Sequence, residues 1–194
     1  YQYMSEVVKR VDKENDDLAE YYLGSLYMDQ KGFIENHSAA LEFFTKAESI
    51  MEAKAKLGYM YYYGLGVEKD INNASGYFLL ALDTGIENSL ADKFSGLGLS
   101  SYYLYEYYHS FSEYGRAFSY LKSSSEHDYV PAMYQLGILY EYGYVPATLI
   151  NLESSKFWFD SVCKHVSEDI YLKSVISLGC DRLNKVNDKI LNIK

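Results

Sequence analysis

The chain has little of what reactive, membrane-spanning or nucleic-acid-binding proteins use. Only two of its 194 residues are cysteine and two are proline. No apolar run approaches the ~20 residues that a bilayer-spanning helix needs. Acidic residues outnumber basic ones 27 to 18, for a formal net charge of −9. The chain therefore lacks the basic surface with which proteins bind nucleic acids or anionic membranes.

Motifs for catalysis and metal binding are missing as well. The four histidines lie far apart, and no pair of histidines stands at ligand spacing beside the two cysteines. The serines form no nucleophile elbow. Gly64 and Gly66 follow a predicted helix, whereas a dinucleotide-binding loop follows a strand. We therefore expect no active site, no metal site and no cofactor.

Small and aromatic residues recur in two frames, in a composition with 23 tyrosines and 48% hydrophobic residues. The first frame is small at positions 1 and 8 and bulky at positions 4 and 5, which is one face of a helix. Its four copies begin at Ala40, Ala74, Ala117 and Ser154. The second frame, Ala-x-x-x-Leu-Gly-x-x-Tyr, precedes most of them. Its three copies begin at Ala19, Ala53 and Ala132.

Paired helices that recur roughly every 40 residues indicate an α-solenoid. We predict an all-α fold, an α-α solenoid of about four repeats with flanking terminal helices and no sheet. The predicted repeats are 16–52, 53–88, 89–128 and 129–165, between the end of a truncated upstream repeat (1–15) and C-terminal helices (166–194). Because the chain opens at Tyr1 without an initiator methionine, we expect it to be a fragment of a larger protein.

Local signals indicate where helices begin and end. Gly64 should take the left-handed conformation that ends a helix, and Ser38 should cap the second helix of the first repeat. The third repeat offers two registers for its first helix, and residues 102–111 should form its loop. In the fourth repeat a longer loop, 143–152, replaces the short turn. A final amphipathic helix should include Val186.

Cys163 and Cys180 lie on separate predicted elements. With no metal site to hold them, we expect two reduced, buried thiols, and a disulfide is the alternative.

The frames resemble the SEL-one-like repeat, a relative of the tetratricopeptide repeat, over about residues 19–162. The resemblance is strongest in the second repeat, and it implies a scaffold fold. A narrower resemblance is to the end of a repeat block in the lumenal subunit of the HRD ubiquitin-ligase complex, the Hrd-three/SEL-one-L family. The residues that carry it are Phe157-Trp158, Val162-Cys163, His165-Val166, Asp169-Ile170 and Leu172. It implies a role in endoplasmic-reticulum-associated degradation, in which the repeats scaffold the ligase and receive misfolded glycoproteins together with a lectin.

Two sequons could carry N-linked glycans. Asn36-His37-Ser38 and Asn73-Ala74-Ser75 have the acceptor pattern. Both should lie in an exposed loop just before the second helix of a repeat. Such tripeptides also arise by chance, but their equivalent placement favours a lumenal protein.

The first helices of successive repeats line the concave surface of tetratricopeptide-like stacks, so residues at fixed offsets from each Leu-Gly pair should face a groove. Tyrosines favour interfaces because they offer a large amphipathic area at low entropic cost. The predicted partner-binding residues are Tyr21, Tyr59, Tyr62, Tyr63, Tyr134, Glu141 and Tyr142.

The sequence thus predicts a non-catalytic scaffold for protein–protein interactions in the lumen of the endoplasmic reticulum. It would be the adaptor of a membrane ubiquitin ligase, with ligase subunits, a lectin and misfolded polypeptides as partners. It would reach the membrane only through missing parts of the parent protein. The alternative is a cytoplasmic scaffold of the same repeat class, or an activator of a membrane enzyme such as a polysaccharide synthase. A third alternative is an enzyme with a site between packed repeats. It would need clustered catalytic side chains, which the sequence does not show.

Overall fold

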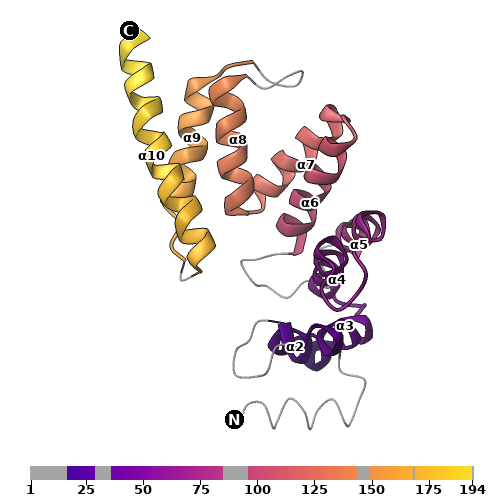
Figure 1. Cartoon of the computed structure of the whole chain (residues 1–194). Coiled ribbons are helices and arrows are strands. Elements are labelled where there is room, and N and C mark those ends of the chain that lie inside the picture. Colours follow the sequence, from indigo (N-terminus) through magenta and orange to yellow (C-terminus); the bar gives the residue numbers. More distant parts are fainter. Residues whose placement is uncertain (1–16, 29–35, 85–95, 144–148, 168, 194) are drawn as a thin grey trace. The chain divides into compact units, whose positions relative to one another are not determined.

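The computed structural model describes residues 17–28, 36–84, 96–143, 149–167 and 169–193, and every regular element in these ranges is an α-helix (Figure 1). This confirms the predicted all-α solenoid. In chain order the helices are α2 (Asp17–Met28), α3 (His37–Lys46), α4 (Met51–Tyr63), α5 (Ile71–Thr84), α6 (Gly96–Ser110), α7 (Tyr114–Glu126), α8 (Val130–Tyr142), α9 (Leu152–Cys163) and α10 (Ile170–Ile193). The predicted end of an upstream repeat, 1–15, lies outside the described residues.

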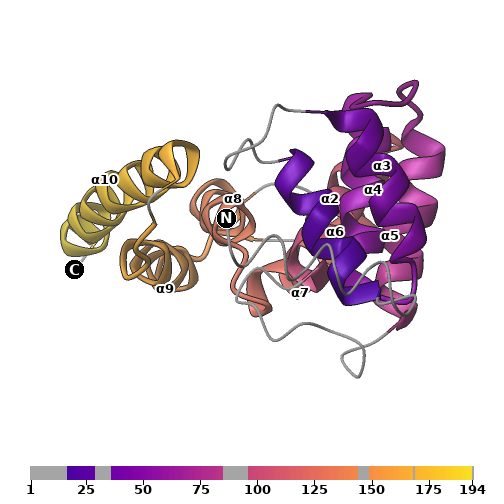
Figure 2. The same cartoon turned by 90° about the horizontal axis from the view of Figure 1, so that it is seen from below.

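The chain divides within α6 into two compact units, residues 1–100 and 101–194. In the first unit α2 packs on α3, α3 on α4, and α4 on α5. In the second unit α7 packs on α8, α8 on α9, and α10 packs along both α8 and α9, as Figures 1 and 2 show. Each unit thus buries its apolar faces between neighbouring helices.

Helix ends follow the polar residues around them. Gly64 ends α4 with a φ of 75° and donates its N–H to the Met60 carbonyl, as predicted. Asp70 caps α5, because its carboxylate accepts the backbone N–H groups of Asn72 and Asn73, at 2.9 and 3.0 Å. The predicted cap at Ser38 is wrong. Asn36 caps α3 by accepting the Ala39 N–H at 3.1 Å, so Ser38 already lies in the first helical turn.

The glycine of each Leu-Gly pair lies where the two helices of a repeat cross. A Cβ at this position would come within 2.8, 2.6 and 2.7 Å of a buried aromatic ring in the first, second and fourth repeats. The pairs are Gly24–Phe44, Gly58–Phe78 and Gly137–Phe159. Each ring therefore packs against bare helix backbone, and any side chain at the glycine would displace it.

The fourth repeat corrects the predicted frame by one residue. A frame that begins at Ser154 turns Phe157 inward, but Phe157 is 60% exposed, whereas Phe159 is 0% exposed. The inward face instead begins at Ser155 and ends at Val162, both of which are buried. Two adjacent serines and three adjacent aromatic residues fit positions 1, 4 and 5 in either register. At position 8 the small Ser161, rather than Val162, favoured the wrong one.

The third repeat is more regular than predicted. Helix α6 runs through most of the predicted loop 102–111, so the loop is wrong. The ring of Tyr108 stacks on Tyr120 of α7, with centroids 5.4 Å apart and planes inclined by 5°. The first and second repeats stack the equivalent rings, at 5.6 and 5.4 Å. Tyr108 is therefore the tyrosine of the second frame, which differs from both predicted registers.

This frame places Leu104 and Tyr105 of α6 at the Leu-Gly positions. The facing residue on α7 is Leu121, where the other repeats have phenylalanine. Tyr105 and Leu121 are both buried in one apolar cluster. The third repeat thus exchanges the sizes of the two facing residues, with the large ring on its first helix and the smaller side chain on its second.

The predicted amphipathic closing helix is confirmed as α10, whose Val186 is 0% exposed. The loop before α9 is described only at its ends. There Gly143 ends α8 with a φ of 65°, and Asn151 caps α9 by accepting the Ser154 N–H at 2.9 Å. The rest of that predicted loop, 144–148, lies outside the described residues.

Candidate functional site

Three tyrosines at the end of α4 contact one another. The ring centroids of Tyr59 and Tyr63 are 4.6 Å apart, and those of Tyr62 and Tyr63 are 5.0 Å apart. The Lys69 ammonium lies 5.7 Å from the centre of the Tyr62 ring. Tyr63 is 50% exposed, and the other two tyrosines are half-buried. We call Tyr59, Tyr62 and Tyr63 the α4 tyrosine cluster.

Tyr21, the predicted groove residue of α2, lies partly against the core. Its ring centroid is 5.9 Å from that of Phe44 and 5.6 Å from that of Tyr22. It packs against the same apolar cluster as Leu57 and Met60 of α4. The Tyr21 ring is therefore partly exposed and also contributes to the stability of the first unit.

In the second unit, all three predicted groove residues, Tyr134, Glu141 and Tyr142, contact α10. The Glu141 carboxylate is 2.5 Å from the Lys189 ammonium and 3.4 Å from the Arg182 guanidinium. Arg182 also donates a 2.7 Å hydrogen bond to the Tyr142 hydroxyl. Both cations lie over the Tyr142 ring, 5.6 Å (Arg182) and 5.1 Å (Lys189) from its centre. The hydrogen bond to Tyr142 raises the pKa of Arg182, although burial acts in the opposite direction, so the guanidinium stays charged.

Glu141 is therefore not an open groove residue, since only 3% of it is exposed. A buried carboxylate needs charged or hydrogen-bonding partners, and α10 supplies both. The offset from Leu-Gly does not reveal that a later helix covers this position, and a role of Glu141 in binding a partner stays a prediction. Tyr134 is also half-buried, and its ring packs near Phe159, with centroids 5.8 Å apart.

Tyr102 has the frame position of a predicted groove residue, but the sequence prediction missed it because its segment was assigned to a loop. It stands two residues before Leu104, as Tyr21 stands before Leu23. Its ring lies 5.2 Å from that of Tyr129. Burial, and then the nearby Glu106 carboxylate, raise the pKa of Tyr102, so its hydroxyl stays protonated. Spacing along the sequence could not set this register, because the stacked rings are 12 residues apart in the third repeat and 16 residues apart in the first two.

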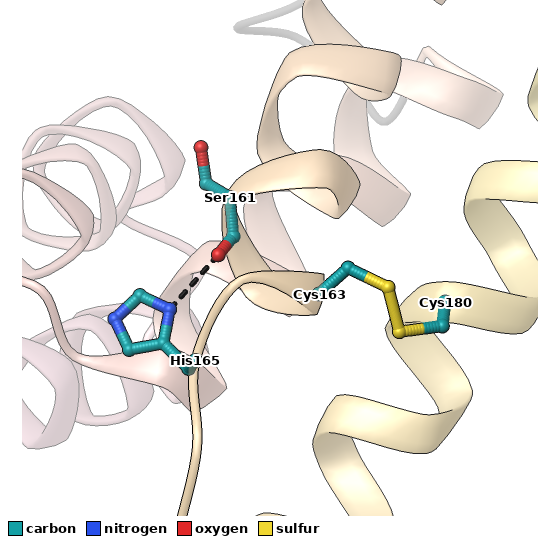
Figure 3. The surroundings of a disulfide bond; sticks show 4 residues. All are labelled: Ser161, Cys163, His165 and Cys180. Atoms are coloured by element: carbon teal, nitrogen blue, oxygen red, sulfur yellow. Dashed lines mark hydrogen bonds between the residues drawn. A yellow bond between two sulfur atoms is a disulfide. The ribbon is translucent and has the colours of Figure 1, made fainter.

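Cys163 and Cys180 form a disulfide between the end of α9 and the middle of α10, with Cα atoms 5.2 Å apart (Figure 3). The expectation of two reduced thiols is therefore wrong, and the alternative holds. The cysteines are 17 residues apart in sequence, and they meet because α10 turns back along α9. Sequence spacing could not show that these helices are neighbours.

Two histidines close helix ends. His165 places its Nδ1 2.8 Å from the Ser161 carbonyl at the end of α9 (Figure 3), and His127 places its Nδ1 2.7 Å from the Ser123 carbonyl in α7. Each carbonyl also accepts the backbone N–H of the residue that caps the helix, so the imidazole adds a second contact there.

Both sequon asparagines are exposed. Asn36 lies just before α3, as predicted, whereas Asn73 is already the third residue of α5. The Asn73 side-chain amide donates a 3.0 Å hydrogen bond to Asp70. Glycan attachment at either position stays a prediction.

Among the described residues, no group of three or more His, Cys, Asp or Glu side chains is placed to hold a metal ion. In the same part of the chain, no helix combines the length and the hydropathy that a bilayer crossing requires.

The helix pairs correspond to a known repeat. The Sel1 repeat profile matches residues 17–49, 52–85 and 130–164, which is more than half of the chain. The chain belongs to the Sel1 repeat family. The matched segments are the first, second and fourth repeats, and the segment without a match holds the third repeat, in which the facing residues exchange sizes. Sel1 repeats indicate a scaffold for protein interactions.

Solved structures support the same fold. A Sel1 repeat protein from Oxalobacter formigenes is 20% identical, with a TM-score of 0.68 over 82% of this chain and 44% of its own. A protective antigen of uropathogenic Escherichia coli with an SLR fold is 21% identical, with a TM-score of 0.62 over 94% of this chain and 44% of its own. This chain thus matches less than half the length of either protein. Both proteins are bacterial, and they do not support the narrower resemblance to the HRD subunit. No curated protein matches the sequence.

Proposed function

We propose that this Sel1 repeat protein is a non-catalytic scaffold that binds partner polypeptides through the α4 tyrosine cluster. The observation that carries the proposal is the packing of three tyrosine rings at the end of one helix, with Tyr63 half exposed. Clustered tyrosines of this kind supply much of the binding energy at protein interfaces. Tyr62 and Tyr63 also occupy the frame positions of Glu141 and Tyr142, which bind a helix within the second unit.

The proposal predicts that changing Tyr59→Ala together with Tyr62→Ala weakens capture of the protein's partners by at least about tenfold, as expected for interface tyrosines. The partners are first identified by affinity capture with the intact protein, and binding is then measured by titration. Melting temperature and helical signal should change little, because these rings pack on Tyr63 of their own helix, whereas the Tyr61 ring stacks on Tyr77 of the partner helix.

Tyr61→Ala is the matched control. Its ring stacks on Tyr77 with centroids 5.4 Å apart, between the two helices of the second repeat. This change should lower the melting temperature and leave the affinity of the folded protein unchanged. Partner capture that survives in the double variant would remove the cluster from the binding surface.

A narrower proposal concerns location and partners. The Cys163–Cys180 disulfide supports an oxidising compartment such as the lumen of the endoplasmic reticulum, and the exposed sequons agree with it. The motif in residues 157–172 then supports an adaptor of a membrane ubiquitin ligase, with ligase subunits, a lectin and misfolded polypeptides as partners. The alternative is a cytoplasmic scaffold or activator of a membrane enzyme.

Glycan occupancy tests the location. In protein from a eukaryotic host, we expect a mass shift on glycosidase treatment that Asn36→Gln abolishes. Asn73→Gln should have the smaller effect, because the Asn73 amide is already hydrogen-bonded to Asp70. Full-length protein that carries no glycan and whose cysteines stay reduced in its own cells would favour the cytoplasmic alternative.

A further inference from the structure

Helix α10 lies on the second unit as a ligand helix lies in a groove. Its buried or ion-paired residues recur at intervals of three and four, the spacing of a helix that packs along another. They are Leu172, Val175, Gly179, Arg182, Val186 and Lys189. Leu172 and Val175 pack with Val130 and Met133 of α8 and with Val162 of α9.

Close approach is possible because this strip includes a glycine. A Cβ at Gly179 would lie 2.5 Å from Cγ1 of Val162 on α9. The backbone of α10 therefore rests directly on the neighbouring helix at that point, and only the smallest residue fits there.

Charge complementarity fixes the rest of the contact. The chain is acidic overall, with a net charge of −9, yet α10 carries four basic and two acidic residues. Two of its cations converge on the single carboxylate of Glu141, whose side chain is 1% exposed. The same cations flank the ring of Tyr142. Removing α10 leaves Glu141 and Tyr142 as an acidic, aromatic surface on α8.

We infer that this surface of α8 is a docking site for a basic amphipathic helix, which α10 occupies and the Cys163–Cys180 disulfide latches. The partner that fits is a helix with apolar residues at three–four spacing and a small residue followed three positions later by arginine and ten positions later by lysine. That is the pattern of Gly179, Arg182 and Lys189 in α10. The site consists of residues of the second unit and shares none with the α4 tyrosine cluster, so it does not depend on that proposal.

The disulfide controls access to the site. The Cys163–Cys180 bond joins residues that are 17 positions apart. A covalent bond across a loop of that length lowers the population of a detached α10 by roughly 100-fold. A dithiol reductant would open the latch. Its two thiols become a disulfide, and their two electrons and two protons convert Cys163 and Cys180 to thiols. A helix from a partner can then compete with α10 for Glu141.

The experiment compares two full-length receptors. Both carry Arg182→Ala and Lys189→Ala, so that their own α10 binds α8 weakly, and one also carries Cys180→Ser, which removes the latch. The probe is a fluorescent peptide of residues 170–193 with Cys180→Ser, and fluorescence anisotropy reports its binding. We expect saturable binding to the unlatched receptor and none to the latched one at the same concentrations. A peptide with both cations changed to alanine should bind at least about tenfold more weakly, because hydrogen bonds to a charged group are lost.

Hydrogen exchange in the wild-type chain provides a second readout that needs no peptide. Amides of residues 170–193 should exchange faster when the disulfide is reduced, while those of α8 in the same sample stay protected. Equal peptide binding by both receptors would overturn the inference. So would the absence of binding to an unlatched receptor whose circular dichroism is that of the wild type, or unchanged exchange of α10 on reduction. In those cases α10 is a permanent part of the solenoid.

Discussion

Phe159→Ala is expected to lower the free energy of unfolding by about 3–5 kcal/mol, whereas Phe157→Ala should change it by less than about 0.5 kcal/mol. The two residues are the same amino acid, two positions apart on one helix. Phe159 is 0% exposed and packs against the bare backbone at Gly137, whereas Phe157 is 60% exposed. Urea unfolding followed by circular dichroism measures both changes.

This comparison tests the register of the fourth repeat directly. If Phe157→Ala were the costly change, the inward face would begin at Ser154, as the sequence frame suggested. Phe78→Ala in the second repeat is the reference, because Phe78 is 1% exposed and lies at the same position beside Gly58. It should cost about as much as Phe159→Ala.

The exchanged sizes in the third repeat predict a strong coupling between two residues. Tyr105→Gly alone should cost about 4–6 kcal/mol, because it removes a buried ring and places glycine within a helix. Leu121→Phe alone should cost about 1–3 kcal/mol through overpacking. Made together, the two changes restore the glycine–phenylalanine pairing of the other repeats. We expect the double variant to be more stable than the sum of the two costs by about 1–3 kcal/mol.

A double-mutant cycle in urea measures that coupling. Tyr103→Gly with Leu121→Phe is the control, because Tyr103 is 6% exposed on the same helix but lies outside the cluster that contains Leu121. The stability costs of these two control changes should add in the double variant. Additive costs for Tyr105 and Leu121 would mean that these side chains do not share one space. Full recovery is not expected, since the Gln135 amide donates to the Tyr105 hydroxyl at 3.3 Å, and glycine removes that acceptor.

The parts of the fold that follow from local spacing could be predicted from the sequence. In the first two repeats, the glycine of the Leu-Gly pair and the phenylalanine of the first frame face each other where the helices cross. The third repeat was misread because its first helix has tyrosine where the other repeats have glycine, and its second helix has leucine where they have phenylalanine. A pattern that searches for glycine at position 105 and an aromatic ring at position 121 finds neither, although the helices pair in the same manner.

The candidate site depends on contacts between segments that are distant in sequence, and there the sequence was less informative. Glu141 has the offset of a groove residue, but only the position of α10 shows that it binds Arg182 and Lys189. The pairing of Cys163 with Cys180 likewise depends on α10 turning back along α9. The role of Tyr59, Tyr62 and Tyr63 in binding partners stays a prediction that rests on exposure and chemistry.

The exchange between Tyr105 and Leu121 also bears on how a chain of similar helices assembles in the right order. During folding, a helix of one repeat can meet the partner helix of another, because most repeats present the same surface. Tyr105 in place of glycine would collide with the ring of Phe78 or Phe159, and Leu121 would leave a gap beside Gly58 or Gly137. Mispaired arrangements are therefore less stable by overpacking on one side and by a cavity on the other. The exchange therefore favours the pairing of α6 with α7 over the pairing of either helix with one from another repeat.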